Sequence, residues 1–163
     1  MYQAHKILVI GGNAAGPSAA AKAKRVNPDA EVILFEAGEF ISTGTCELPY
    51  LFSGEIKDYN KIVFFTPESF EKNKGVKVYY NNYVKEIDRK HKIIFVLNRR
   101  SNTVSEFEYD KLILTTGSKP NQIYNLPFAL ENVFSYKSVK NYLDVKNYLD
   151  WFTTVKLTQK IQK

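Results

Sequence analysis

Cysteine is nearly absent from this sequence of 163 residues, which has one cysteine, one tryptophan, one methionine and two histidines. A single cysteine cannot form a disulfide within the chain, so the fold does not depend on one. His5 and His91 have no partners at the spacing of a metal or catalytic site, and both are expected to be exposed. The sequence therefore predicts no metal site.

Long hydrophobic runs are also missing. No apolar segment approaches the ~20 residues of a membrane span, and residues 7–10 are too short for the core of a signal peptide. Apolar residues still make up 44% of the chain, enough for one globular domain with a core. Together with the lone cysteine, this pattern favours a cytoplasmic protein without a membrane partner.

The charge is positive but dispersed. Lysine and arginine outnumber aspartate and glutamate by 23 to 17, which gives a net charge of +6. This excess fits an anionic partner, either nucleic acid or a phosphorylated cofactor. There is no long basic tract and no RNP, zinc-finger or helix-turn-helix pattern, so nucleic-acid binding is the weaker reading and we expect none.

The first 36 residues have the pattern of a βαβ unit. Residues 6–10 are a short apolar run rich in β-branched side chains, which indicates a buried strand, and they end in two glycines. Residues 14–26 are nearly all alanine, serine, lysine and arginine, which predicts a helix, and residues 31–36 read as a second buried strand. This order predicts a parallel pair of strands.

The rest of the chain changes character. Four short runs rich in valine, isoleucine and aromatic residues predict an antiparallel meander, at residues 76–80, 83–88, 92–97 and 105–109. Residues 111–115 indicate another buried strand, and residues 138–152 have helical spacing. The fold class expected is therefore α/β, a Rossmann-like βαβ unit with an inserted antiparallel β-meander.

The glycine turn and one acidic residue predict a nucleotide site. "VIGGNAAG" resembles the dinucleotide fingerprint G-x-G-x-x-G, with asparagine at the middle glycine and small residues that let a pyrophosphate approach the backbone. Glu36 lies 20 residues after Gly16, where a carboxylate accepts hydrogen bonds from an adenosine ribose. The alternative is that these glycines serve packing only.

The lone cysteine lies in "STGTCELPY", residues 42–50. Out of context, Cys46 is either a buried apolar residue or a redox nucleophile whose sulfur partner is missing. A helix start near Leu48 would favour the thiolate, which is the nucleophilic form, whereas the adjacent Glu47 opposes it.

These stretches together resemble the N-terminal part of the pyridine nucleotide-disulfide oxidoreductases. The closest likeness is to the single-cysteine branch, with coenzyme A-disulfide reductases, NAD(P)H oxidases and persulfide reductases. The matching segments are "KILVIGGNAAGPSAAAKAKR", "VILFEAGEFISTGTCELPYLFSGEI", "EIDRKHK", "YDKLILTTGSKPN" and "NVFSYKSVKNYLDVKNYL". They follow one another in family order from residue 6 to about residue 149.

The resemblance implies FAD as the cofactor at the glycine turn and NAD(P)H as the electron donor. Its pyrophosphate would bind at Gly11, Gly12, Asn13, Ala14, Ala15 and Gly16. Glu36 would hold the adenosine ribose, and the backbone around Val84 would lie near the adenine. Thr115, Thr116 and Gly117 would match a second flavin-side motif.

The resemblance also implies a role for the cysteine. Cys46 would be the redox cysteine, forming a mixed disulfide with coenzyme A or a persulfide with another small-molecule substrate. This supplies the missing partner, because the second sulfur belongs to the substrate. By position, the residues that would contact coenzyme A are Ser18, Lys22, Arg25, Ser42 and Thr45. An NAD(P)H oxidase-like flavoprotein is the alternative within the family.

Family members are longer than this chain, and the full-length enzymes are homodimers with two dinucleotide-binding domains. By the resemblance, residues 1–152 are the N-terminal part of an incomplete FAD-binding domain. Residues 153–163 lead towards an NAD(P)-binding domain whose glycine fingerprint these 163 residues do not contain. We therefore expect the 163-residue chain alone to have no steady NAD(P)H turnover. The alternative function is a truncated, non-catalytic nucleotide-binding fragment.

Overall fold

A computed structural model describes residues 5–121, 130 and 132–161. The chain divides into two compact units, and each is described by itself. The first contains Met1–Gly44 and Val63–Gly117, and the second contains Thr45–Ile62 and Ser118–Lys163.

A parallel four-stranded sheet forms the centre of the first unit, in the order β5-β2-β1-β9. The strands are β1 (Lys6–Ile10), β2 (Glu31–Phe35), β5 (Lys77–Tyr79) and β9 (Lys111–Leu114). Ile7 lies opposite Val32 of β2 on one side and Lys111 of β9 on the other. The predicted βαβ unit is confirmed, since α1 (Ala15–Val26) connects β1 to its parallel neighbour β2.

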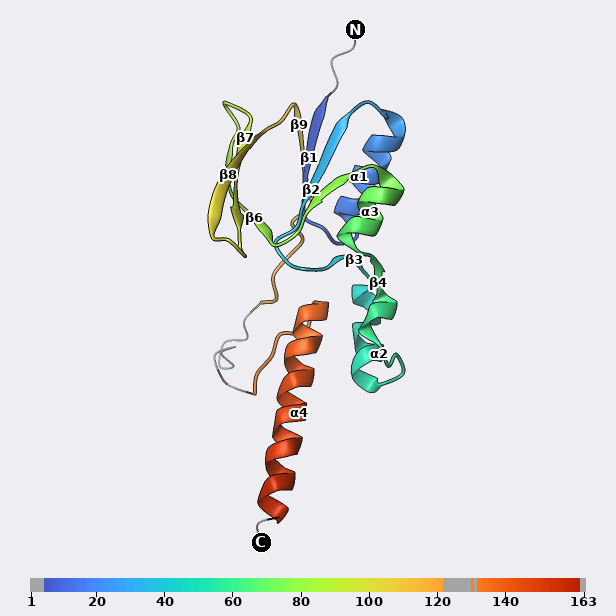
Figure 1. The fold of residues 1–163 in the computed structure, drawn as a ribbon, viewed down its shortest axis with the longest axis vertical. Helices are drawn as coiled ribbons and strands as arrows, with labels where there is room; N and C mark the ends of the chain where they lie inside the picture. The colour runs from blue at the N-terminus through green and yellow to red at the C-terminus, as the bar shows by residue number, and fades with distance from the viewer. Residues whose placement is uncertain (1–4, 122–129, 131, 162–163) are drawn as a thin grey trace. The chain divides into compact units, whose positions relative to one another are not determined.

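Both faces of this sheet are covered, which explains why β1 and β2 are apolar at nearly every position. The helices α1 and α3 (Pro67–Lys74) lie on one face. The antiparallel meander β6 (Asn82–Asp88), β7 (Ile93–Asn98) and β8 (Thr103–Glu108) lies on the other, as Figure 1 shows. Alternate side chains therefore enter two different cores.

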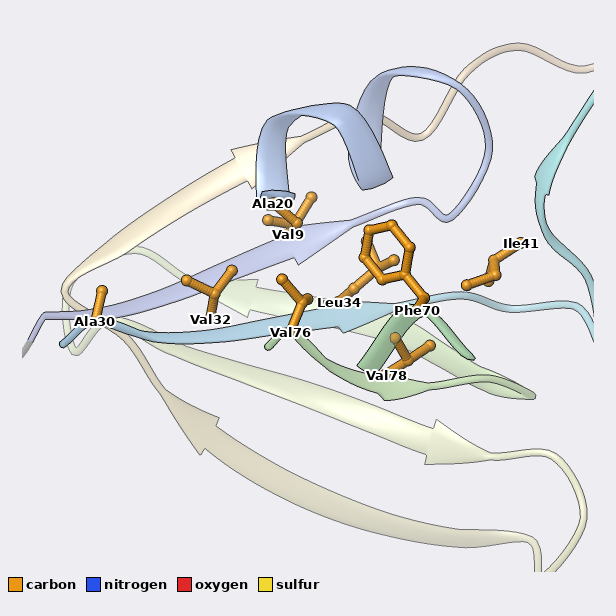
Figure 2. Close-up of a cluster of buried hydrophobic side chains, with 9 residues drawn as sticks. All are labelled: Val9, Ala20, Ala30, Val32, Leu34, Ile41, Phe70, Val76 and Val78. Atoms are coloured by element: carbon orange, nitrogen blue, oxygen red, sulfur yellow. The ribbon is translucent and has the colours of Figure 1, made fainter. Parts of the chain in front are cut away.

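The core on the helix side is shown in Figure 2. Val9 of β1 and Leu34 of β2 are fully buried there, and Phe70 of α3 is 2% exposed. The other members are Ala20, Ala30, Val32, Ile41, Val76 and Val78. On the opposite face, Leu8, Ile10, Ile33 and Phe35 pack against Ile94 and Val96 of the meander. The meander thus completes the second core.

Two strand predictions are wrong in detail. Residues 76–80 do not belong to the meander, because β5 pairs parallel with β2 in the central sheet. Residues 111–115 are not a buried strand, because β9 is an edge strand that pairs only with β1 among the described strands. Leu114 is 59% exposed as a result.

A short ribbon joins the first unit to the cysteine segment. Strands β3 (Ile41–Thr43) and β4 (Val63–Phe65) pair antiparallel, with Ile41 opposite Phe65. Cys46 lies in the segment that connects these two strands.

The second unit contains the short helix α2 (Leu48–Ser53), which was expected near Leu48, and the long helix α4 (Val139–Ile161). Tyr136 donates a hydrogen bond to the Leu48 carbonyl at 2.8 Å, and its ring packs edge-on against Phe52. The predicted helix 138–152 is confirmed but too short, since α4 continues to Ile161. Among the described residues, no helix has both the length and the hydropathy to cross a membrane.

Candidate nucleotide-binding site

Three segments meet where parallel strands end. Because β1, β2 and β9 run in the same direction, their carboxyl ends lie at one edge of the sheet. The glycine turn follows β1, Glu36 follows β2 and Thr115 follows β9. This edge is where open α/β sheets bind their ligands.

The glycines of the turn are required by close packing. A Cβ at Gly16 would overlap the Gly11 carbonyl oxygen, and a Cβ at Gly11 would overlap the Thr115 carbonyl. Gly11 also has a φ of +110°, which side-chain-bearing residues rarely adopt. A Cβ at Gly12 would lie 2.7 Å from the Glu36 Cβ. Close packing thus explains why Gly11, Gly12 and Gly16 are glycines. The evidence for a ligand comes instead from the backbone groups that the turn leaves exposed.

The start of helix α1 is open to solvent. Asn13, Ala14 and Ala15 are exposed. Ala14 occupies the N-cap position without a side-chain cap, and the first turn has no acidic residue. The first N–H groups of a helix have no partner within it and favour anions. These residues therefore fit the pyrophosphate that was expected here.

Glu36 is half-buried and held by two backbone donors. Its Oε2 accepts a hydrogen bond from the Gly12 N–H at 2.7 Å, and its Oε1 accepts one from the Gly38 N–H at 2.6 Å. Each carboxylate oxygen has a second lone pair, so Glu36 retains acceptor capacity for ribose hydroxyls. The carboxylate is fixed next to the turn that would hold the pyrophosphate.

Thr115 ties β9 to the glycine turn. Its backbone N–H donates to the Ile10 carbonyl at 2.8 Å. Its hydroxyl lies 2.8 Å from the same carbonyl and 3.0 Å from that of Gly11. The next two residues, Thr116 and Gly117, are exposed, and Gly117 has a φ of +67°. Thr115 therefore has a structural role, and Thr116 and Gly117 are the more exposed residues of this motif.

Asn13, which replaces a fingerprint glycine, has its own contact. Its Oδ1 accepts hydrogen bonds from the Thr43 hydroxyl at 2.9 Å and the Thr43 N–H at 3.3 Å. The Ser42 N–H donates to the Gly12 carbonyl at 2.8 Å, and Ser42 has a φ of +50°. Asn13 thus links the glycine turn to β3, an interaction that glycine cannot make.

The expected coenzyme A residues separate into groups. Ser18, Lys22 and Arg25 are exposed and lie at helical spacing along one face of α1. Ser42 belongs to the same compact unit as α1, whereas Thr45 belongs to the second. These residues therefore do not form one cluster within a single unit.

Cys46 lies in the second unit and is exposed, within the short 3-10 turn Thr45–Glu47. The alternative of a buried structural thiol is therefore wrong. Glu47 occupies the N-cap position of α2. Val84 of β6 is half-buried and packs against the core between sheet and meander.

Sequence reasoning missed the residues that surround the loop after Glu36. The Asn81 N–H donates to the Gly38 carbonyl at 2.8 Å, and the Arg99 guanidinium donates to the Ala37 carbonyl at 3.0 Å. The pair Arg99-Arg100 was visible only as a local basic spot. No sequence pattern places it beside a loop 62 residues earlier.

These features define a Rossmann-like fold with a dinucleotide-type edge, where a glycine turn, an acidic residue and a threonine motif meet. The chain belongs to the pyridine nucleotide-disulphide oxidoreductase family, whose model matches residues 5–149. Enzymes of this family depend on FAD and take electrons from NAD(P)H. The resemblance inferred from the motifs is confirmed.

Two relatives are similar in sequence over most of this chain. The NAD(P)H coenzyme A polysulfide/persulfide reductase of Pyrococcus horikoshii is 35% identical over 71% of the chain and 25% of its own length. The coenzyme A disulfide reductase of Staphylococcus aureus is 32% identical over 78% of the chain and 30% of its own length. The chain thus spans about a quarter to a third of these relatives.

Solved structures agree with the described fold. The crystal structure of reduced CoADR-RHD from Bacillus anthracis has a TM-score of 0.86 and 32% identity. It is matched over 91% of this chain and 27% of its own. The NAD-dependent persulfide reductase of A. fulgidus has a TM-score of 0.83 and 29% identity, over 89% and 27%.

Proposed function

We propose that this chain is the FAD- and cysteine-bearing segment of a flavoprotein that reduces small-molecule disulfides or persulfides and is similar to the coenzyme A-disulfide reductases. The observation that carries the proposal is the meeting of the glycine turn, Glu36 and the Thr115 segment at one edge of the parallel sheet. The names of the relatives support the substrate class.

The roles of the residues follow from this arrangement. The exposed N–H groups at the start of α1 would bind the pyrophosphate, and Glu36 would accept hydrogen bonds from the adenosine ribose. Gly11, Gly12 and Gly16 let β9 and Glu36 approach closely enough to form the site. Thr116 and Gly117 would lie on the flavin side, and the backbone near Val84 on the adenine side. When bound, FAD would supply two-electron transfer from NAD(P)H to sulfur.

Cys46 would supply the nucleophile. Its thiolate attacks one sulfur of the substrate disulfide, a mixed disulfide forms, and the other substrate sulfur leaves as a thiolate. The exposure of Cys46 gives a substrate access to the thiol. Lys22 and Arg25 present cations on one helix face, to which phosphates of coenzyme A would bind. Ser18, Ser42 and Thr45 would add polar contacts.

FAD titration of the 163-residue chain tests the cofactor half of this proposal. Saturable binding, seen as a change in flavin fluorescence, is expected. Ala15→Glu places a carboxylate at the start of α1, which stabilises the helix but repels the pyrophosphate. It should therefore weaken FAD binding without lowering stability. The neutral Ala15→Gln adds similar bulk without the charge, so it should weaken FAD binding less than Ala15→Glu. A chain that shows no saturable change in flavin fluorescence, and is colourless after free FAD has been removed, would contradict the proposal and fit the non-catalytic fragment.

A further inference from the structure

The two arginines at the tip of the β7–β8 hairpin reach the loop that follows β2. Arg99 donates a hydrogen bond from its guanidinium to the Ala37 carbonyl at 3.0 Å, and its backbone N–H donates to the Asn81 carbonyl at 2.8 Å. Its guanidinium also lies 5.0 Å from the centre of the Tyr83 ring. Arg99 therefore connects three segments that are separate in sequence.

Arg100 adds a second set of contacts on the same side. Its guanidinium lies 4.9 Å from the centre of the Tyr80 ring. In the amide orientation that satisfies both groups, the Asn81 side-chain oxygen accepts from the Nε of Arg100 at 3.0 Å and from its Nη2 at 3.2 Å. Asn81 is only 9% exposed and has a φ of +57°, so this turn is firmly constrained.

The β2 loop receives contacts along its whole length from this region. The Asn82 N–H donates to the Glu36 carbonyl and the Asn81 N–H to the Gly38 carbonyl, each at 2.8 Å. Arg99 holds Ala37 between them. Glu39 forms a 3.9 Å ion pair with Arg100, but both side chains are more than 60% exposed, and such pairs stabilise little. Of the side-chain contacts to this loop, the hydrogen bond from Arg99 to Ala37 is therefore the stronger one.

We propose that Arg99, assisted by Arg100 and Asn81, is a positioning residue for the nucleotide site. It holds the β2 loop so that the Gly38 N–H and the Gly12 N–H both keep their bonds to the Glu36 carboxylate. Arg99 acts through its hydrogen bond to Ala37 rather than on the Glu36 carboxylate directly. The inference rests on the proposed function, because it assigns Arg99 the task of fixing the acceptor for the adenosine ribose.

Loop geometry alone would not hold Glu36 in this way. Ala37 and Gly38 are only half-buried, Glu39 is exposed, and none of them is part of either core. Without anchors, a short loop that contains glycine samples many conformations, and ordering it on binding reduces affinity. A loop already fixed by the hairpin avoids this cost, so we expect the two arginines to affect affinity for the adenosine end more than stability.

Nuclear magnetic resonance of the 163-residue chain tests the proposal, with ADP as the probe of the adenosine end. Arg99→Gln should weaken ADP binding about tenfold, the effect of losing one hydrogen bond from a charged donor. Hydrogen exchange of the Gly38 amide should become about tenfold faster for the same reason. Arg99→Lys keeps a cationic donor and should recover most of the affinity, and Arg100→Gln should have a smaller effect.

Arg89→Gln is the matched control, because Arg89 is an exposed arginine at the opposite end of the meander. It should leave both ADP affinity and Gly38 exchange within twofold of the wild type. The proposal is overturned if Arg99→Gln binds ADP like the wild type, or if affinity falls while Gly38 exchange stays unchanged. If the wild type binds neither ADP nor FAD, the proposed function fails. Gly38 exchange then still decides whether Arg99 holds the loop.

Discussion

The carboxylate of Glu36 bridges two backbone N–H groups from different segments, that of Gly12 at 2.7 Å and that of Gly38 at 2.6 Å. One side chain therefore joins the glycine turn after β1 to the loop after β2. Both oxygens already accept a hydrogen bond from the protein, and each keeps a second lone pair. Glu36 thus has a structural role and a proposed binding role at once.

Replacing Glu36 tests both roles. Glu36→Gln leaves only one oxygen for two donors, so one half-buried N–H loses its acceptor, at a cost of about 1–3 kcal/mol in the free energy of unfolding. FAD binding should weaken as well. Glu31→Gln, at the exposed start of the same strand, is the control and should change stability little. Equal stability of the two variants in urea unfolding would contradict the bridging role.

Gly16 should not tolerate a side chain. In Gly16→Ala the new Cβ would overlap the Gly11 carbonyl oxygen, so the turn must move, and the chain should lose several kcal/mol of stability or fail to fold. Gly54→Ala is a useful comparison, because a Cβ there meets no heavy atom within 4 Å and only the φ of +83° is strained. That variant should cost about 1–2 kcal/mol. Thermal unfolding compares the two.

The Thr115 hydroxyl is expected to stabilise the β9 connection. Thr115→Val keeps the shape but removes the donor to the Ile10 and Gly11 carbonyls, so stability should fall by about 1 kcal/mol. Thr115→Ser retains the hydroxyl and should lose less. Urea unfolding measures both free energies. A valine variant as stable as the wild type would mean that water replaces the hydroxyl without loss.

Cys46 is expected to react with coenzyme A disulfide, because it is exposed. Mass spectrometry should show one coenzyme A adduct on the wild type and none on Cys46→Ser. Glu47→Gln removes a negative charge beside Cys46. The anionic coenzyme A disulfide is then repelled less, so adduct formation should become a few-fold faster. A rate that is unchanged in Glu47→Gln would show that the Glu47 carboxylate has no effect on the reaction.

Asp88 should make stability depend on acid pH. The hydrogen bond to the His91 ring at 2.6 Å, with further backbone bonds, lowers the pKa of Asp88 below its ordinary value of 3.8. A lowered pKa in the folded state means that the contribution is present above pH 3.8 and is lost as the pH falls through the folded value. Asp88→Asn should therefore show a shallower loss of stability below pH 4. A slope equal to that of the wild type would exclude this linkage.

The βαβ unit was predictable because its signals are local. Continuous apolar runs mark strands covered on both faces, and the glycine turn with Glu36 at fixed spacing marks the edge where a nucleotide binds. The assignment of residues 76–80 was wrong for a related reason. The short run around Val78 looks like its neighbours in composition, and only the parallel pairing with β2 distinguishes it. Strand pairing depends on residues far apart in the sequence, so local composition does not predict it.

By itself, the sequence determined the family, the fold class and the positions of the glycine turn, Glu36 and Cys46. These depend on residue types at fixed spacings along the chain. Only the tertiary structure decided that close contacts with Thr115 and Glu36 require the glycines, that β9 is an edge strand, and that Arg99 reaches Ala37. Those contacts join segments up to about a hundred residues apart, and they arise from how strands pair and pack.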